Sequence, residues 1–525
     1  MANKHLFKTG SVPAADTINE AGGVAYAFSA AHALAQYAIT GTFHGTYYAS
    51  EKDQLDKVID LAKRASTELV AKTAVYCRER GRMKDVPAFL IAHLATRDVA
   101  MMLRIFPRVI DDGRMLRNFV QIVRSGVTGR KSFGSAPKRA LRSWFADRSP
   151  ETIFRQSIGQ SPSLSDVIKM VRPPPRNDKG EADAVREALY GYLIGKSVDD
   201  SKLPPLARAF EAFKKGAGPM PDVPFEMLTA LPLRTEHWTE LAKKMTFNQL
   251  RQNLNTLLRH GVFDDHAIVE HVAARLSDAN AIARSRTMPF QLLAAYRHVD
   301  AKMPKAIVRA LERAVEHAVA NVPELQGDVV LCPDVSGSMH SALTGARGSA
   351  TTKVRCIDVA ALIVAALLRK HRSAKVMPFS DDVVSLPRPI NALDSVVENA
   401  ELLARLPSGG TACSAPLRRL DEAEEAPDLV VFVSDNQSWS DFGLHARHSS
   451  GTPMANEWAK LRARNPRAKL VLIDLQPYST TQMKESADVL EVGGFSDAVF
   501  DVLASFSKGE LEGDGFLRTI EAVSI

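Results

Sequence analysis

The feature that most constrains the fold is the segment 328–339, in which an apolar run ends in the spacing Asp-x-Ser-x-Ser at Asp334, Ser336 and Ser338. Apolar runs that end in polar residues are typical of buried parallel strands, whose side chains are covered on both faces of the sheet. Short side chains with hard oxygen atoms suit Mg²⁺, which requires nearly octahedral oxygen ligation. The segment therefore predicts a strand that delivers metal ligands at its carboxyl end.

Two later segments supply the same kind of oxygen ligand. Ser-Gly-Gly-Thr ends at Thr411, and an apolar run over residues 429–433 is followed by Asp435. Ligands of an open α/β sheet bind outside the carboxyl ends of its strands, where the strand order reverses. We therefore expect one divalent metal site, most suited to Mg²⁺, built from five residues: Asp334, Ser336, Ser338, Thr411 and Asp435. The alternative is that both aspartates only cap the helices that follow them.

The C-terminal part of the chain, residues 326–525, alternates between strand and helix patterns. Apolar runs predict strands over residues 375–379, 383–386 and 470–475, and helical spacing predicts helices over residues 355–370 and 391–406. This alternation predicts a doubly wound, parallel α/β sheet. The Gly-x-Gly-x-x-Gly fingerprint of dinucleotide-binding folds is absent, and Ser336 stands where a phosphoaspartate-type nucleophile motif would need a second aspartate.

Residues 1–325 show helical spacing almost throughout. Many short amphipathic helices over such a length predict a solenoid of stacked helix pairs of the HEAT type, although no clean sequence repeat is present. A compact globular α-domain is the alternative. The expected helices span residues 55–80, 86–93, 99–109, 115–125, 227–233, 247–259, 265–276 and 290–298.

Basic residues gather in this helical part. It holds 47 Lys and Arg against 34 Asp and Glu, whereas residues 326–525 hold 20 against 26. Excess positive charge favours association with polyanions, although a solvated basic surface is the alternative. On a helix that begins near Pro137, side chains four apart share a face and would grip phosphates in a salt-dependent way. The residues predicted to contact a nucleic-acid backbone are Arg124, Arg130, Lys131, Lys138, Arg139, Arg142, Lys169 and Arg172.

Several classes of protein are disfavoured by the sequence. No apolar run of 18 residues or more predicts a membrane span, and residues 1–20 lack the apolar core of a secretory signal. The 4 cysteines form no Cys-x-x-Cys pair, which disfavours zinc and fits a reducing compartment. No catalytic motif is recognisable. We therefore expect a cytoplasmic binding protein and not an enzyme.

Four strings carry a family resemblance. They are Gly-Thr-Tyr-Tyr at 45–48, Arg-Ala-Leu-Arg at 139–142, Met-Thr-Phe-Asn-Gln-Leu-Arg at 245–251 and Asp-Val-Ser-Gly-Ser-Met at 334–339. The first three resemble the TROVE module, and the last, with Thr411 and Asp435, resembles the metal-ion-dependent adhesion site of von Willebrand factor A domains. Together they resemble the Ro autoantigen family, as a bacterial Ro ortholog, over nearly the whole chain.

The resemblance implies an architecture and a function. It implies a monomeric ring of helical repeats, residues 1–325, closed by a von Willebrand A-like domain, residues 326–525. Ro proteins bind small noncoding Y RNAs on an outer basic surface and single-stranded ends of misfolded RNA in the central hole. Bacterial relatives are similar to adaptors that feed RNA to an exoribonuclease. In von Willebrand A domains an acidic partner group often completes the metal site, so the alternative function is a protein-interaction scaffold.

Two pairs of residues bear on what the resemblance implies for RNA contacts. Pro162 and Leu164 replace a tryptophan and a histidine that are typical of the family, so an RNA contact through that histidine is not expected here. Tyr47 and Tyr48 have the aromatic character that unpaired RNA bases stack upon, but a core or turn role is the alternative.

Overall fold

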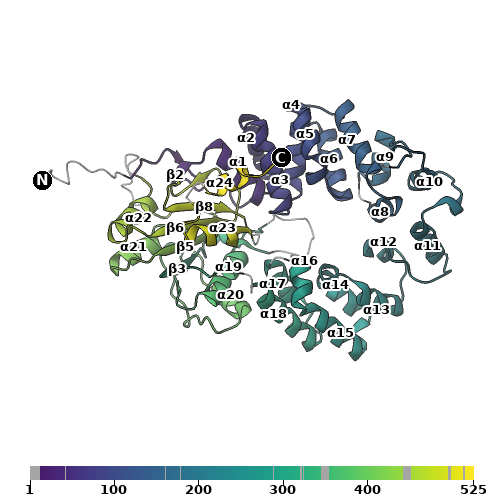
Figure 1. The fold of residues 1–525 in the computed structure, drawn as a ribbon. Helices are drawn as coiled ribbons and strands as arrows, with labels where there is room; N and C mark the ends of the chain where they lie inside the picture. Colours follow the sequence, from purple (N-terminus) through teal and green to yellow (C-terminus); the bar gives the residue numbers. More distant parts are fainter. Residues whose placement is uncertain are drawn as a thin grey trace. The chain divides into compact units, whose positions relative to one another are not determined.

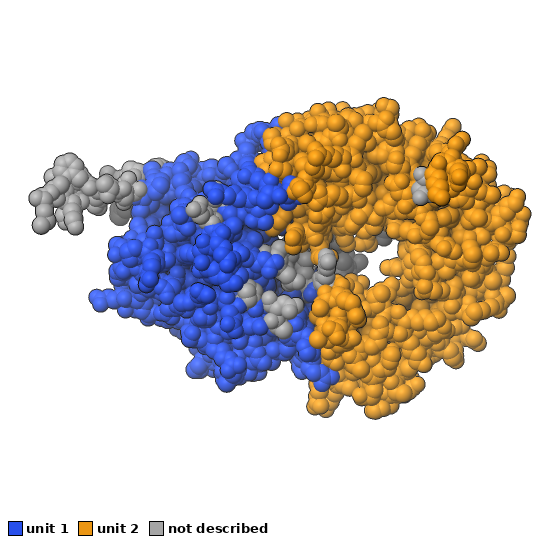
Figure 2. Space-filling view, viewed as in Figure 1, with its two compact units in different colours: residues 1–65, 286–298, 311–523 blue, residues 66–285, 299–310, 524–525 orange. Residues whose placement is uncertain are grey.

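The computed structural model describes the chain except for residues 1–11, 42, 160, 178, 286, 288, 320, 321, 323, 344–353, 442–450, 495–497 and 512–514. The described residues form two compact units (Figure 2). Unit 1 combines residues 1–65, 286–298 and 311–523, and unit 2 combines residues 66–285, 299–310 and 524–525. The predicted domain boundary after residue 325 divides the sequence differently and stays a prediction.

Unit 1 is built on a five-stranded parallel sheet with the order β4-β3-β5-β6-β8 (Figure 1). β3 is followed in sequence by β4 on one side and then by β5 on the other, so the strand order reverses between β3 and β5. The expected doubly wound sheet is confirmed. Its strands are β3 (Val329–Pro333), β4 (Lys375–Val376), β5 (Leu429–Ser434), β6 (Lys469–Asp474) and β8 (Val489–Gly493).

Helices cover this sheet and bury its apolar strands. Trp458, Leu417 and Met454 pack into one core with Phe432 and Phe379 of the sheet region. Burial of each large apolar side chain contributes roughly 1.5–3 kcal/mol to folding. The helices of unit 1 are α1 (Ala30–Thr40), α2 (Glu51–Arg64), α17 (Pro289–His298), most of α18 (Lys305–Val319), α19 (Cys356–Lys370), α20 (Val396–Ala404), α21 (Ala415–Glu422), α22 (Pro453–Arg464), α23 (Ala498–Ser507) and α24 (Gly515–Glu521), with the short 3-10 turn η3 (Gly337–His340).

A second, small sheet joins the beginning of the chain to its end. The antiparallel strands β1 (Thr17–Ile18), β2 (Val24–Ala27) and β7 (Thr480–Thr481) form this sheet in the order β1-β2-β7. α1 contacts β8 and α24, and its His32 lies 3.0 Å from the Glu485 carboxylate. The first 65 residues therefore belong to the sheet-bearing unit.

Unit 2 is helical among its described residues. Most of its helices contact helices that are near them along the chain, which is typical of stacked helix pairs. The helical prediction is confirmed, and the HEAT assignment stays a prediction. The helices are α3 (Thr67–Glu79), α4 (Asp85–Arg97), α5 (Val99–Val109), α6 (Gly113–Ser125), α7 (Ser135–Ala146), α8 (Pro150–Arg155), α9 (Leu164–Val171), α10 (Ala184–Leu193), α11 (Pro205–Lys214), α12 (Phe225–Thr229), α13 (Thr235–Lys244), α14 (Phe247–Arg259), α15 (His266–Leu276) and α16 (Ala279–Ser285), with 3-10 turns η1 (Asp200–Lys202) and η2 (Val262–Asp264).

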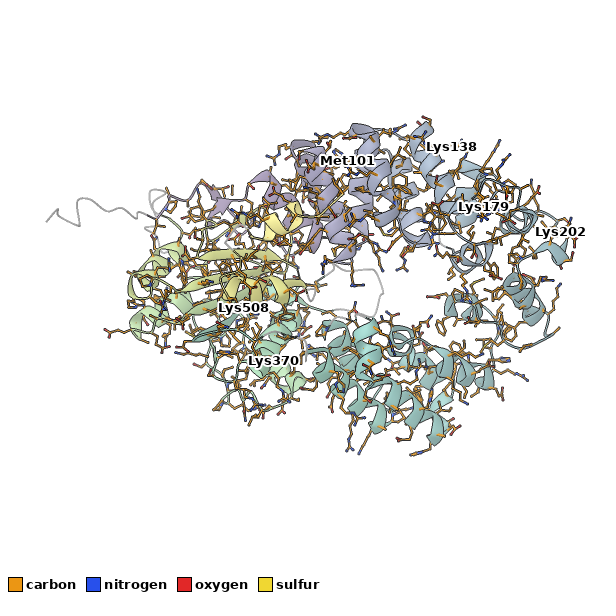
Figure 3. All side chains as sticks on the ribbon, in the orientation of Figure 1. Met101, Lys138, Lys179, Lys202, Lys370 and Lys508 are labelled. Atoms are coloured by element: carbon orange, nitrogen blue, oxygen red, sulfur yellow. The ribbon has the colours of Figure 1, made fainter. Side chains whose placement is uncertain are left out.

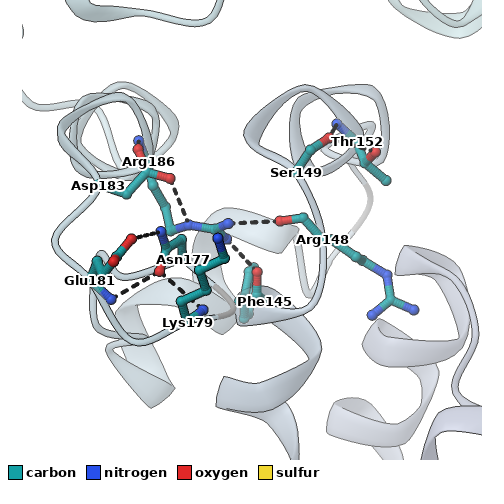
Figure 4. Close-up of polar contacts among 9 residues, drawn as sticks. All are labelled: Phe145, Arg148, Ser149, Thr152, Asn177, Lys179, Glu181, Asp183 and Arg186. Atoms are coloured by element: carbon teal, nitrogen blue, oxygen red, sulfur yellow. Dashed lines mark hydrogen bonds and ion pairs between the residues drawn. The ribbon is translucent and has the colours of Figure 1, made fainter.

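A buried arginine fixes the position of α7 within unit 2 (Figure 4). Arg186 at the start of α10 is 3% exposed, and its guanidinium donates to the carbonyl of Phe145 and, at 2.9 Å, to that of Arg148. The Asp183 carboxylate accepts from its Nε at 3.3 Å. Because a buried guanidinium needs partners for its charge, these contacts hold the carboxyl end of α7 against α10.

Two sequence expectations differ from the structure. The helix expected over residues 55–80 is two helices, α2 and α3, because the Ser66 hydroxyl accepts from the Leu69 N–H and starts a new helix. The strand expected over residues 383–386 is reduced to one bridge between Phe379 and Val383. No helix among the described residues has the length and apolar character needed to cross a membrane.

Candidate metal site and nucleic-acid interface

The carboxyl ends of β3 and β5 bring the predicted metal ligands together. Asp334 follows β3 and is fully buried; its Oδ1 accepts from the Ser336 N–H at 2.8 Å and its Oδ2 from the Ser434 hydroxyl at 2.5 Å. The Asp334 N–H donates to the Val433 carbonyl at 3.0 Å, which ties the two strand ends together. The first ligand is therefore held at the point where the strand order reverses, as the sequence predicts.

The two serines lie at a spacing that suits one cation. Their hydroxyl oxygens are 3.2 Å apart, close to the separation of about 3 Å between neighbouring ligands of an octahedral Mg²⁺ ion. Asp435 Oδ1 accepts from the Gln437 N–H at 3.3 Å. The other oxygen of Asp435, Oδ2, is buried with no hydrogen-bond partner among the described residues. This donor set fits a hard divalent cation.

Thr411 lies in the adjacent glycine loop. It is 1% exposed, and its carbonyl accepts from the N–H groups of Trp439 and Ser440 at 2.9 Å. The Gly337 N–H donates to the Gly409 carbonyl at 2.9 Å and links this loop to the serine loop. A Cβ at Gly409 would come within 2.2 Å of the Asp381 carboxylate, so the close approach requires glycine.

Carboxylates dominate the electrostatics of this edge. Burial raises the pKa of Asp334 to about 6, and burial together with Asp334 raises the pKa of Asp435 to about 7. Within the described part of the chain, no three His, Cys, Asp or Glu side chains form a metal-binding group. A divalent cation would neutralise the two buried charges.

Two further buried carboxyl groups lie on β6 and β8 of the same sheet, and neither was predicted from the sequence. Asp474 ends β6 and Glu491 lies in β8, and both are buried. Burial raises the pKa of each, with the Asp435 charge adding to the effect on Asp474 and the Asp474 charge to the effect on Glu491. Asp474 closes an apolar run just as Asp334 and Asp435 do, so the same pattern could have indicated it.

The raised pKa values predict an unusual pH dependence of stability. An aspartate whose pKa is higher in the folded state binds its proton more tightly there, so the metal-free protein loses stability as pH rises from about 4 through 7. At about 1.4 kcal/mol per pKa unit, Asp334 alone contributes a change on the order of 3 kcal/mol. Melting curves in EDTA between pH 4 and pH 8 measure this decline. In the Asp334→Asn, Asp435→Asn double variant the decline should shrink; an equal decline would assign it to other groups.

The structure also gathers part of the predicted RNA-binding set. A groove of about 550 Å³ lies in unit 2 between the end of α6, the start of α7 and α9. Lys138, labelled on α7 in Figure 3, lines it together with Arg124 and Lys131. The α7 N-terminus opens here without a side-chain cap, so free backbone N–H groups add to the positive potential. Phe133 and Met170 form its apolar part.

The other five predicted residues divide into two kinds. Arg130 donates to the carbonyls of Ser132 at 2.8 Å and Ala95 at 3.2 Å, and Arg142 donates to that of Val171 at 2.8 Å, so both hold loops in place. The remaining three are exposed: Arg139, Lys169 and Arg172. Whether any of the eight contacts RNA stays a prediction.

The structure also places Leu164, Tyr47 and Tyr48. Leu164 begins α9 and is completely buried, so its side chain faces the helical core and not solvent. Tyr47 is 58% exposed, whereas Tyr48 packs edge-on against Tyr478 in unit 1 with ring centroids 6.0 Å apart. The alternative of a packing role therefore describes Tyr48 better than Tyr47.

Comparison with protein families matches both halves of the chain. The Ro60 vWA domain family matches residues 329–507, and the TROVE domain family matches residues 219–301. The first match contains all five predicted metal ligands. The second lies mostly in unit 2, C-terminal in sequence to the residues of the basic groove, and its residues 286–298 belong to unit 1.

Individual relatives agree with these matches. The RNA-binding protein RO60 of Deinococcus radiodurans is 25% identical over 537 aligned residues, which cover 94% of this chain and 95% of the relative. The RNA-binding protein RO60 of Caenorhabditis elegans is 24% identical over 289 residues, covering 51% of this chain and 41% of the relative. The crystal structure of the D. radiodurans RO (RSR) protein has a TM-score of 0.61 at 21% identity and covers 92% of this chain and 100% of its own, which shows the shared fold.

Proposed function

We infer that this chain, which belongs to the Ro family and carries both its TROVE domain and its Ro60 von Willebrand factor A domain, is an RNA-binding protein. Two relatives are named RNA-binding proteins, and one of them aligns with nearly the whole chain. The observation that carries the proposal is the groove at the start of α7, where Arg124, Lys131 and Lys138 surround one opening. Closely spaced cations at a helix terminus can bind a phosphate backbone, and such contacts do not distinguish one base from another.

The finer proposal follows the family resemblance. The basic helical surface holds a small noncoding, Y-like RNA, and a central hole takes the single-stranded ends of misfolded or structured RNA. The protein acts in RNA quality control or as the adaptor of an exoribonuclease. It works as a cytoplasmic monomer and binds RNA without cleaving it, while Mg²⁺ at Asp334, Ser336, Ser338, Thr411 and Asp435 stabilises the von Willebrand A domain or recruits a protein.

RNA extracted from the purified protein, followed by titration with a hairpin that carries single-stranded tails, tests the proposal. The logarithm of affinity should fall linearly with the logarithm of salt concentration between 50 and 200 mM, by roughly 10³-fold or more if about six phosphates are contacted. A preparation without RNA that also ignores the hairpin at low salt would contradict RNA binding. Mg²⁺-dependent cleavage that Asp334→Ala eliminates would contradict the non-enzymatic role.

A second candidate function has one observation in its favour. Trp439 is 46% exposed and lies beside Thr411, because its backbone N–H donates to the Thr411 carbonyl at 2.9 Å. An exposed aromatic side chain next to a metal site suits a protein partner that brings an acidic group and an apolar neighbour. On this reading the chain is a protein-interaction scaffold, and it should show no affinity for structured RNA at moderate salt.

A further inference from the structure

The turn of the N-terminal hairpin contains a buried asparagine. Asn19 lies between β1 and β2 and is 5% exposed, although Ile18 and Glu20 on either side of it are exposed. Its side-chain oxygen accepts from the N–H groups of Ala21 at 3.1 Å and Gly23 at 2.8 Å. These two contacts close the turn, and they fix the orientation of the amide, because only its oxygen can accept from N–H groups.

The nitrogen of the same amide points to a distant part of the chain. Asn19 Nδ2 donates to the Ser438 carbonyl at 2.7 Å, across 419 residues of sequence. The next residue of the turn adds a second contact, because the Glu20 N–H donates to Gln437 Oε1 at 3.0 Å. Gln437 and Ser438 are both 0% exposed, and all four residues belong to unit 1. The hairpin is therefore hydrogen bonded to the segment that directly follows Asp435, a predicted metal ligand.

The same segment is hydrogen bonded to two predicted ligands. The Gln437 N–H donates to Asp435 Oδ1 at 3.3 Å. On the other side of Ser438, the Trp439 N–H donates to the Thr411 carbonyl at 2.9 Å. A displacement of residues 437–439 would therefore disturb the Asp435 carboxylate and the Thr411 backbone together.

A further contact joins the small sheet to this segment. Asn436 has a φ of 60°, a left-handed conformation that turns the chain sharply after Asp435. Its Nδ2 donates to the Thr481 hydroxyl at 3.2 Å, and both side chains are buried. Thr481 belongs to β7 and pairs with Tyr26 of β2. The small sheet and its turn thus contact three consecutive residues, 436–438.

We propose that Asn19 is a positioning residue of the metal site, because it fixes the loop that carries Asp435 and that contacts Thr411. The inference rests on the proposed metal site. Outer partners of metal ligands fix the orientation of those ligands and so raise the affinity for the metal. Linked equilibria are reciprocal, so a cation that is bound more tightly when the hairpin is docked must also hold the hairpin more firmly.

Asn19→Asp tests the contact selectively. The carboxylate keeps the two acceptor contacts that close the turn but cannot donate to the Ser438 carbonyl. Titration of the full-length protein with Mn²⁺ in a calorimeter should show roughly 3- to 10-fold weaker binding, the factor that corresponds to one net hydrogen bond. The added negative charge would by itself favour a cation, so a loss of affinity cannot come from charge.

Lys484→Ala is the matched control. It removes the ion pair of 3.0 Å between Lys484 and Asp16, which holds the same hairpin away from residues 435–438. Because this pair is exposed to solvent, the control should bind Mn²⁺ within about twofold of the unchanged protein. An equal loss of affinity in Lys484→Ala would overturn the role of Asn19, since general loosening of the hairpin would then be sufficient.

Hydrogen exchange in residues 17–27 provides a second measurement that needs no variant. Saturating Mn²⁺ should slow exchange there in the unchanged protein and in Lys484→Ala, and much less in Asn19→Asp. A merely structural role would lower the melting temperature of the metal-free variant and leave both Mn²⁺ affinity and this protection unchanged.

The two measurements separate the positioning role from the metal site itself. Unchanged Mn²⁺ affinity in Asn19→Asp, or exchange in residues 17–27 that does not respond to Mn²⁺, would overturn the positioning role and leave the metal site intact. Absence of Mn²⁺ binding in the unchanged protein would instead overturn the metal site.

Discussion

Replacement of Arg124, Lys131 and Lys138 by alanine together should weaken the binding of a tailed RNA hairpin by about 100-fold or more at 50 mM salt. The three cations line one groove beside the uncapped start of α7, so we expect each to neutralise a separate phosphate. Each lost phosphate contact reduces the salt slope by about one, so the slope should flatten by about three. Binding curves at several salt concentrations measure both quantities.

A matched triple variant separates this groove from net charge. Arg155, Lys214 and Lys244 also lie in unit 2 and carry the same charge, but each is paired with an acid, Asp222, Glu211 or Glu240, at 2.5–2.8 Å. Their replacement by alanine should leave the salt slope nearly unchanged. An equal loss in both triple variants would mean that RNA responds to overall charge, and no loss in the groove variant would remove the groove from the RNA surface.

Asp334→Ala should abolish binding of Mg²⁺ and Mn²⁺, with affinity reduced by more than about 1000-fold. Asp334 is fully buried and holds Ser336 and Ser434 in place, so its loss removes a charge and disorganises the neighbouring ligands. In the unchanged protein, a cation at 100 times its Kd should stabilise the folded state by about 2.7 kcal/mol. Calorimetry gives the affinity, and melting curves with and without Mg²⁺ give the stabilisation.

The same variant tests whether the two proposed sites are independent. Affinity for the RNA hairpin should remain within about twofold, because the groove residues belong to unit 2 and Asp334 to unit 1. Asp421→Ala serves as the control. Asp421 lies on α21, where its carboxylate pairs with Arg464 and Lys460, so this variant should bind Mg²⁺ as the unchanged protein does. Loss of both metal and RNA binding in Asp334→Ala would show that the sites are coupled.

Local pattern was sufficient for most helices and for the buried strands. The helices at Val99–Val109 and Phe247–Arg259 have the expected limits, because apolar residues at helical spacing and clear caps leave few alternatives. Pro107 lies inside the last turn of the former helix. The strand at Lys375–Val376 is shorter than expected, because edge strands are limited by pairing that sequence periodicity does not encode.

Sites are predictable where the ligands share a strand end and unpredictable where distant segments meet. Asp334 and Asp435 each follow an apolar run, so topology alone placed them together. Tyr48 packs against Tyr478 only through the fold of unit 1, and no spacing in the sequence indicates this contact. Similarly, the sequence predicts Arg142 as a cation available for RNA, but in the structure its Nε donates to the Val171 carbonyl at 2.8 Å.

The small sheet β1-β2-β7 and the packing of α1 on β8 have a consequence for biosynthesis. Residues 12–65 leave the ribosome first, yet their partners at Thr480–Thr481 and Val489–Gly493 are made last. At 5–20 residues per second, the nascent N-terminal helix waits roughly 20–90 s before its docking surface exists. During that interval the apolar face of α1, which includes Leu34 and Ile39, stays uncovered and can bind a chaperone. A protein fragment that starts at residue 326 would lack residues 12–65 and their packing against β7 and β8. The von Willebrand A-like domain is therefore not an independent folding unit.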